Sequence, residues 1–248
     1  SRRQTALADA EFFLFGASKN HKYKLPFLYA GVTPALISYV CSKLISVIPI
    51  VVPLGINEKP YFDHLDIEDK CLGPANCITT GKSMSKDRVL NLYKKGFEVG
   101  KSSIQPILIS ESVPGGTTTA QAVMEAFGLN VSNLVGSSLF KAPRVLKRKV
   151  IQTGLMNANL KNDFDSFDVI SSVGDPFQAF SMGLLIGARS VNQFVVLSGG
   201  SQMIAVVLLA LEILDIENKK EFVEKVFIAT TSWLANDSSL CNLINLIN

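Results

Sequence analysis

The stretch Ile107-Leu-Ile-Ser-Glu111-Ser-Val-Pro-Gly115-Gly116-Thr117-Thr118-Thr119-Ala-Gln-Ala-Val-Met124 changes its hydrophobic period in the middle, from a short apolar run to a spacing of three and four residues. This change predicts a strand, a tight glycine turn and a helix. The first N–H groups of such a helix, Gly116 to Thr119, have no acceptor within the helix and attract an anion. We therefore expect a phosphate group at this turn.

A simpler interpretation of Gly115-Gly116 is a turn that needs only a positive φ. The threonines that follow favour a phosphate site, because threonine is a middling helix former and its hydroxyl is a good phosphate donor. Glu111 is either an exposed loop carboxylate or an acid of the site. Beside a phosphate it would have to address another part of the ligand, such as a ribose hydroxyl or a base. We expect the phosphate to contact Gly115, Gly116, Thr117 and Thr118.

The segment Gln193–Ser201 repeats this pattern, with an apolar strand, the pair Gly199-Gly200, the hydroxyl of Ser201 and then a helix. A further strand is predicted at Phe227–Thr230. Strands that alternate with helices predict an α/β fold, a doubly wound and mainly parallel sheet with helices on both faces. Because ligands of such sheets bind at the carboxyl ends of the strands, we expect Glu111, Gly199 and Thr230 at that edge.

The remaining segments are assigned from period, caps and breakers. Helices are predicted at Ala35–Ile45 after Thr33-Pro34, from Ser83 to near Gly100, at Ala142–Leu155, and after the N-cap Asp175 and Pro176. Buried strands, or one strand and a turn, are predicted at Glu11–Gly16 and Pro26–Gly31, with strand character again at Val47–Pro53. Loops or linkers are predicted at Asn57–Lys82, 129–141 and Lys161–Asp168.

Composition excludes several classes of protein. The net charge is +3, with neither a basic arm nor aromatic residues interleaved with basic ones, so a nucleic-acid partner is not expected. The longest apolar run, Leu44–Ile56, contains two prolines and is too short to span a membrane. The 48% hydrophobic content favours burial in the fold or in a subunit interface, hence a homodimer. Four cysteines without a Cys-x-x-Cys pair, and no secretory signal, indicate a reduced, cytoplasmic protein without a metal site.

Known phosphate-binding motifs are also missing. The chain contains neither a Gly-x-x-x-x-Gly-Lys-Ser/Thr loop nor a Gly-x-Gly-x-x-Gly fingerprint. Phosphoribosyltransferases that use a pyrophosphorylated sugar and magnesium usually have two adjacent acidic residues before this kind of turn, whereas this chain has only Glu111. We therefore expect a sugar monophosphate as ligand, without an obligatory metal or cofactor. His21 and His64 lie in polar loops and are interpreted as solvated. A basic cluster on the helix after residue 141 is interpreted first as a solvated face: Arg144, Lys147, Arg148 and Lys149.

Three segments, Glu111–Ala120, Val173–Asp175 and Leu197–Val206, resemble the archaeal and cyanobacterial branch of the nicotinate-nucleotide:dimethylbenzimidazole phosphoribosyltransferases. The resemblance covers most of residues 10–235. It implies a Rossmann-like large domain, a small helical domain built from both chain ends, and a homodimer. We accordingly assign residues 1–25 to the small domain as a lead-in, and residues 26–248 to a nucleotide-binding domain without its C-terminal segment.

The resemblance also implies the reaction. The family transfers the 5-phosphoribosyl group of nicotinate mononucleotide to a lower-ligand base of cobamides, dimethylbenzimidazole or another azole or purine, and gives an α-ribotide and nicotinate. Two alternatives to this transferase stay open, a non-catalytic nucleotide-monophosphate-binding protein and an NAD-type oxidoreductase. The absence of a Gly-x-Gly-x-x-Gly fingerprint disfavours the oxidoreductase.

Site residues carried over by position come from the same resemblance. Glu111 and the Gly115–Thr118 turn match the family's Glu-x-Gly-x-Gly-Asn-Thr-Thr loop, although the spacing glycines differ. Gly199-Gly200, followed by Ser201, match a second glycine turn, and Asp175 follows the family's Val-Gly pair. The resemblance implies that these four residues bind the substrate or its phosphate. Lys149 aligns with a lysine expected near the phosphate. Glu111 would support the oxocarbenium-like transition state, whereas the general base is a glutamate expected beyond Asn248.

Overall fold

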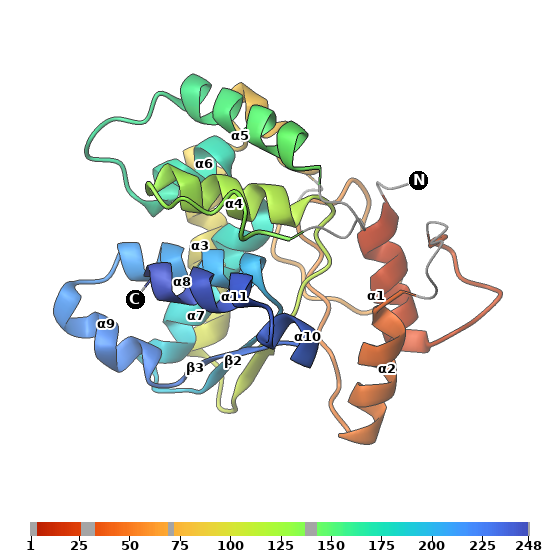
Figure 1. Cartoon of the computed structure of the whole chain (residues 1–248). Coiled ribbons are helices and arrows are strands. Elements are labelled where there is room, and N and C mark those ends of the chain that lie inside the picture. Colours follow the sequence, from red (N-terminus) through yellow and green to blue (C-terminus); the bar gives the residue numbers. More distant parts are fainter. Residues whose placement is uncertain (1–3, 26–32, 69–71, 137–142, 248) are drawn as a thin grey trace. The chain divides into compact units, whose positions relative to one another are not determined.

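The computed structural model describes residues 4–25, 33–68, 72–136 and 143–247. They form two compact units, which are considered separately (Figure 1). Unit 1 contains Ser1–Gly73 and Ser112–Pro114, and unit 2 contains Pro74–Glu111 and Gly115–Asn248. Residues 1–25, expected as the lead-in of a small domain, are part of unit 1, which extends to Gly73.

Unit 1 contains the helices α1 (Thr5–Phe15) and α2 (Ala35–Leu44). Glu11 of α1 is fully buried and accepts hydrogen bonds from the backbone N–H groups of Lys22 (2.8 Å) and Tyr23 (2.9 Å) and from the Tyr61 hydroxyl (2.6 Å). Burial alone would raise the pKa of Glu11, but these hydrogen bonds outweigh it and lower the pKa below its ordinary value. One carboxylate thus joins three segments of the unit.

Several sequence predictions for unit 1 are wrong. Glu11–Gly16 is the end of a helix, not a strand, because the buried positions Leu7, Ala8, Glu11 and Phe12 follow a helical period that starts before the apolar run. Val47–Pro53 forms no strand, since its two prolines lack N–H donors. The predicted strand at Pro26–Gly31 lies outside the described residues. The helix predicted after Thr33-Pro34 is confirmed as α2.

The histidines of unit 1 are also more enclosed than predicted. His21 and His64 were expected to be solvated, yet their side chains are only 15% and 14% exposed. In each ring one nitrogen pairs with a nearby backbone carbonyl, that of Gly16 at 2.7 Å for His21 and that of Phe62 at 2.7 Å for His64. They therefore contribute to local structure.

Unit 2 is built on a sheet of three parallel strands in the order β1 (Ile107–Ile109), β2 (Val195–Ser198) and β3 (Val226–Ala229). In the register, Ile109 pairs with Leu197, and Leu197 pairs with Ile228. Both turns predicted after apolar strands follow β1 and β2. The predicted α/β class with a parallel sheet is confirmed.

The helices described for unit 2 are η2 (Ile78–Thr80), α3 (Lys86–Lys101), α4 (Gly116–Ala126), α5 (Arg144–Ala158), α6 (Ser166–Val173), α7 (Pro176–Ser190), α8 (Ser201–Glu212), α9 (Ile216–Val223), α10 (Ser232–Ala235) and α11 (Ser238–Ile247). Among them, α3, α6, α7 and α10 begin at a side-chain cap. Helix α6 is a correction, because the predicted linker Lys161–Asp168 ends in a capping box formed by Asp165 and Asp168.

Helices α3 and α7 approach each other very closely. A Cβ atom at Gly183 of α7 would lie 2.0 Å from the carbonyl oxygen of Tyr93, and one at Gly96 of α3 would lie 2.1 Å from that of Phe180. Gly100 and Gly187 make equivalent contacts one turn further along. These four glycines bring the two backbones together and fix α7, whose N-cap is Asp175.

Candidate functional site

The carboxyl ends of the three parallel strands meet at one edge of the sheet. Because Ile109, Leu197 and Ile228 are aligned, Glu111, Gly199 and Thr230 follow the strands at equivalent positions. The N–H of Gly199 donates to the carbonyl of Ala229 (2.9 Å), which extends the pairing of β2 and β3 up to the second glycine turn. This edge is where ligands of parallel α/β sheets bind.

The first glycine turn presents an open helix N-terminus. Gly115 has φ 88° and is exposed, and a Cβ there would meet nothing within 4 Å, so its backbone conformation is what requires glycine. The Gly115 carbonyl accepts the N–H groups of Thr118 (2.8 Å) and Thr119 (3.4 Å). The four free donors expected from the sequence are therefore reduced to Gly116 and Thr117, the first two residues of α4.

The three threonines after this turn differ in role. Thr117 and Thr118 are half-buried, and no hydrogen bond within the described residues engages their hydroxyls. Thr119 Oγ1 instead lies 2.5 Å from Oδ2 of Asp175 and 3.0 Å from the carbonyl oxygen of Gly116. Two hydroxyls remain available to a ligand, and the third is used inside the protein.

Asp175 belongs to the structural support of the turn. Its side chain is buried, and Oδ1 accepts the N–H of Gln178 (3.0 Å), while the Gln178 side chain accepts the N–H of Asp175 (3.1 Å). This capping box starts α7, as the N-cap and N1 proline predicted. Burial raises the pKa of the Asp175 carboxyl above its ordinary value.

At the second glycine turn, glycine is required because neighbouring side chains leave no room for a Cβ atom. A Cβ at Gly199 would lie 3.0 Å from Cγ of Met203, and one at Gly200 would lie 2.8 Å from Cδ2 of Leu234. The Gly200 carbonyl accepts the N–H of Met203 (3.0 Å) as α8 begins, and Ser201 Oγ lies 3.2 Å from the side-chain oxygen of Gln202. Helix α10 thus lies against this turn through Leu234.

The basic helix α5 presents two lysines very differently. Lys149 is exposed, whereas Lys147 is buried and its Nζ donates to the carbonyl of Gly136 (3.2 Å). Burial lowers the pKa of Lys147, and the charge of Glu125 opposes this shift. The spacing of Lys147 from Ile151 places Lys147 on the buried face of the helix.

Helices α4 and α5 pack side by side and begin at the same end, so the first turn of α5 and the first glycine turn face the same side of unit 2 (Figure 1). Lys147 is the fourth residue of α5. Its Nζ donates to the carbonyl of Gly136 and interacts with the charge of Glu125, which lies near the C-terminal end of α4. Lys149, two residues further along α5, is exposed.

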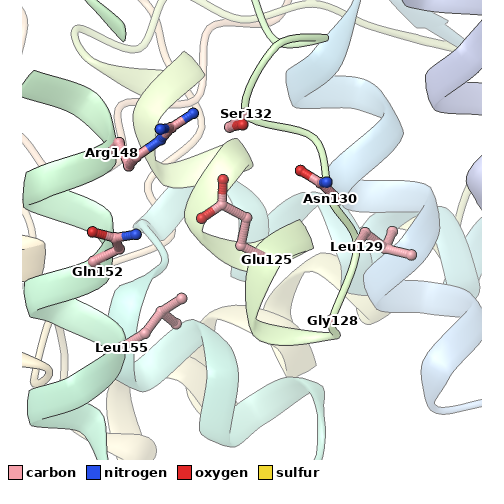
Figure 2. Close-up of a pocket in the computed structure, with 8 residues that line it drawn as sticks. All are labelled: Glu125, Gly128, Leu129, Asn130, Ser132, Arg148, Gln152 and Leu155. Carbon is pink, nitrogen blue, oxygen red and sulfur yellow. The ribbon is translucent and has the colours of Figure 1, made fainter. Parts of the chain in front are cut away.

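A pocket of about 360 Å³ lies elsewhere on unit 2, between the end of α4, the loop after it and α5 (Figure 2). Its lining residues are Glu125, Gly128, Leu129, Asn130, Ser132, Arg148, Gln152 and Leu155. Glu125 is nine residues after Gly116, which corresponds to about 14 Å along a helix. The pocket contains none of the predicted site residues and is separate from the sheet edge.

No group of three or more His, Cys, Asp or Glu side chains in the described ranges lies close enough to share a metal ion. None of the helices described is both long and apolar enough to cross a lipid bilayer.

Comparison with known proteins identifies the family. Residues 35–216 match a protein family described as phosphoribosyltransferase. This chain belongs to the nicotinate-nucleotide:dimethylbenzimidazole phosphoribosyltransferase family. The resemblance seen in the glycine turns is thereby confirmed at the level of the family.

Relatives of this phosphoribosyltransferase family member occur in cyanobacteria. A UPF0284 protein of Prochlorococcus marinus strain MIT 9312 is 76% identical over 248 residues, which is 100% of this chain and 64% of the relative. A UPF0284 protein of Gloeothece citriformis strain PCC 7424 is 34% identical over 244 residues, 96% of this chain and 65% of that protein. The chain thus spans less than two thirds of the length of these relatives.

Two solved structures share the fold. The crystal structure of CobT from Thermus thermophilus matches with a TM-score of 0.70 at 16% identity, over 98% of this chain and 67% of that one. The crystal structure of the nicotinate-nucleotide-dimethylbenzimidazole phosphoribosyltransferase from the same organism matches with a TM-score of 0.67 at 14% identity, over 98% and 66%. At these identities the likeness establishes the fold, including the predicted Rossmann-like arrangement.

Proposed function

We propose that the protein transfers the 5-phosphoribosyl group of nicotinate mononucleotide to an azole or purine base, such as dimethylbenzimidazole, and releases nicotinate and an α-ribotide. The first glycine turn carries this proposal. It offers two helix-terminal N–H groups and the hydroxyls of Thr117 and Thr118 at the carboxyl edge of a parallel sheet. This combination suits a phosphate monoester.

The other predicted residues then surround the sugar. The turn at Gly199, Gly200 and Ser201 follows β2 at the same edge of the sheet. Glu111, which follows β1 directly, is half-buried and is proposed to stabilise positive charge at the anomeric carbon. A phosphate fixed at the glycine turn would convert binding energy into alignment of that carbon with the incoming base nitrogen.

The phosphate also needs a cation, and we assign it to Lys147. A buried ammonium group loses hydration and gains most from a nearby anion, whereas the exposed Lys149 is already solvated. Lys147→Met should therefore weaken nicotinate mononucleotide binding about tenfold or more, as measured by isothermal titration calorimetry. The matched Lys149→Met variant should change the Kd less than about twofold. The opposite ranking would restore Lys149 as the phosphate ligand.

Catalysis is tested by incubating the protein with nicotinate mononucleotide and either dimethylbenzimidazole or adenine, and by following released nicotinate and the α-ribotide by chromatography. Release that depends on the base supports the transferase. Binding of the nucleotide without release would favour a non-catalytic nucleotide-monophosphate-binding protein. Absence of both binding and release would refute the assignment of the glycine turn as a phosphate site.

A further inference from the structure

The Thr119 hydroxyl lies within hydrogen-bond distance of two acceptors. The first is Oδ2 of Asp175 at 2.5 Å, and the second is the carbonyl oxygen of Gly116 at 3.0 Å. Thr119 and Asp175 are 56 positions apart in the chain, and this contact joins the first turn of α4 to the N-terminus of α7. The two helix starts are thus tied together by a pair of side chains.

The protons at this site can be counted. A threonine hydroxyl has one proton and can donate to one of the two acceptors, but its oxygen can accept a second hydrogen bond. If Asp175 were ionised, Thr119 would have to donate to it, and the contact with Gly116 would lack a proton. If the Asp175 carboxyl carries a proton on Oδ2, it donates to Thr119 Oγ1, and Thr119 donates to Gly116. In the first arrangement the two contacts must share a single hydroxyl proton, and only the second arrangement gives each contact a proton of its own.

The surroundings of Asp175 agree with the second arrangement. The carboxyl is buried, and no ion pair reaches it within the part of the chain that the structure describes. Its other oxygen, Oδ1, accepts the N–H of Gln178, a bond that a protonated carboxyl retains. An uncompensated buried charge is costly, and a proton removes that cost.

We propose that Asp175 is a positioning residue for the first glycine turn: its carboxyl proton is donated to Thr119 Oγ1, and the Thr119 hydroxyl is donated to the Gly116 carbonyl. Bonds then run from the N-cap of α7 to the first residue of α4. These bonds hold the Gly116 and Thr117 N–H groups in one direction, toward a bound phosphate. This positioning role rests on the proposed function. Asp175 acts through the turn and does not touch the nucleotide.

Substitutions at the two ends of the contact test this arrangement. Asparagine is close to a neutral carboxyl in shape, since its Oδ1 can cap α7 and its Nδ2 can donate to Thr119. Asp175→Asn should keep the unfolding equilibrium constant within about threefold of wild type, whereas Asp175→Ala should raise it at least tenfold, about 1.4 kcal/mol. Thr119→Val keeps the branched shape without the hydroxyl, and Thr119→Ser keeps the hydroxyl.

Binding of nicotinate mononucleotide, measured by calorimetry on the same variants, separates positioning from stability alone. Asp175→Ala and Thr119→Val should raise the Kd about tenfold under conditions where both are folded by circular dichroism. Asp175→Asn and Thr119→Ser should restore it to within about threefold of wild type.

Three outcomes are informative. If the Asp175→Asn variant is as unstable as the Asp175→Ala variant, the proposal that the Asp175 carboxyl is neutral is overturned, because an ionised acceptor would then be required. An unchanged Kd in folded Thr119→Val would overturn the positioning role. If the wild-type protein does not bind nicotinate mononucleotide at all, the proposed function fails, and with it the positioning role, while the unfolding measurements still decide which group carries the proton.

Discussion

Gly183 provides the most demanding test of how unit 2 is held together. It lies in α7 where α7 meets α3, and a Cβ there would be 2.0 Å from the Tyr93 carbonyl oxygen and 3.0 Å from the Phe97 nitrogen. Ordinary van der Waals contact starts at 3.4 Å, so Gly183→Ala needs about 1.4 Å of additional separation. Both neighbours are backbone atoms, which cannot rotate away as a side chain can.

The cost can be worked from this geometry. Adding a methyl group to a well-packed core costs about 1–3 kcal/mol, and the upper end applies because two helix backbones must move. Alanine returns about 1 kcal/mol through its higher helix propensity. The net loss in the free energy of unfolding should therefore be about 2 kcal/mol. With a urea m-value of about 3 kcal/mol/M, the midpoint should fall by about 0.7 M.

Urea titration followed by far-ultraviolet circular dichroism measures this loss. The matched control is Gly136→Ala, since a Cβ at Gly136 would meet nothing within 4 Å and the residue has no positive φ. The control should stay within about 0.5 kcal/mol of wild type. A Gly183→Ala variant as stable as this control would refute the close approach of α3 and α7, and with it the placement of the α7 N-terminus beside the glycine turn.

Two further predictions concern buried polar groups. Glu11→Gln should destabilise unit 1 by about 2 kcal/mol at pH 7. The pKa of folded Glu11 is lowered below 4.5, so its contribution to stability is present above that pH and is lost as the pH falls through the folded pKa. Urea titrations should therefore show a smaller difference between the variant and wild type at about pH 3.5 than at pH 7. Equal differences at the two pH values would contradict this. Arg189 donates to the carbonyls of Gln193, Glu221 and Phe222, so Arg189→Met should cost about 3 kcal/mol in a thermal or urea unfolding experiment, and a loss below about 1 kcal/mol would show that these carbonyls find other donors.

Local signals in the sequence were sufficient for most of unit 2. The change of hydrophobic period after Ile109 and its repeat before Gly199 predicted two strand-turn-helix units. Such periods can be read from neighbouring residues alone, without knowledge of tertiary contacts. The N-cap Asp175 followed by Pro176 predicted the start of α7 for the same reason. In unit 1 the apolar run before Gly16 was too short to show whether it forms a strand or a helix. The structure shows a helix, in which Glu11 is buried on the same face as the apolar residues.

The candidate site was predictable only in part. The sequence pointed to the glycine turn, because glycines and hydroxyls after an apolar strand have a local meaning. It placed Asp175 among the residues of the site, and the structure adds that the Asp175 and Thr119 side chains contact each other. It also favoured Lys149 over Lys147, since charge alone does not show which lysine faces the interior.

The sequence by itself therefore determined the order of elements in unit 2, the parallel α/β class, the two glycine turns and the family. The tertiary structure decided which donors at the first turn stay open, which lysine is buried, and how closely α7 approaches α3. These features depend on contacts between residues that are far apart in the chain, such as Thr119 with Asp175 and Gly183 with Tyr93. No local pattern encodes such contacts, because they form only when the helices pack against each other.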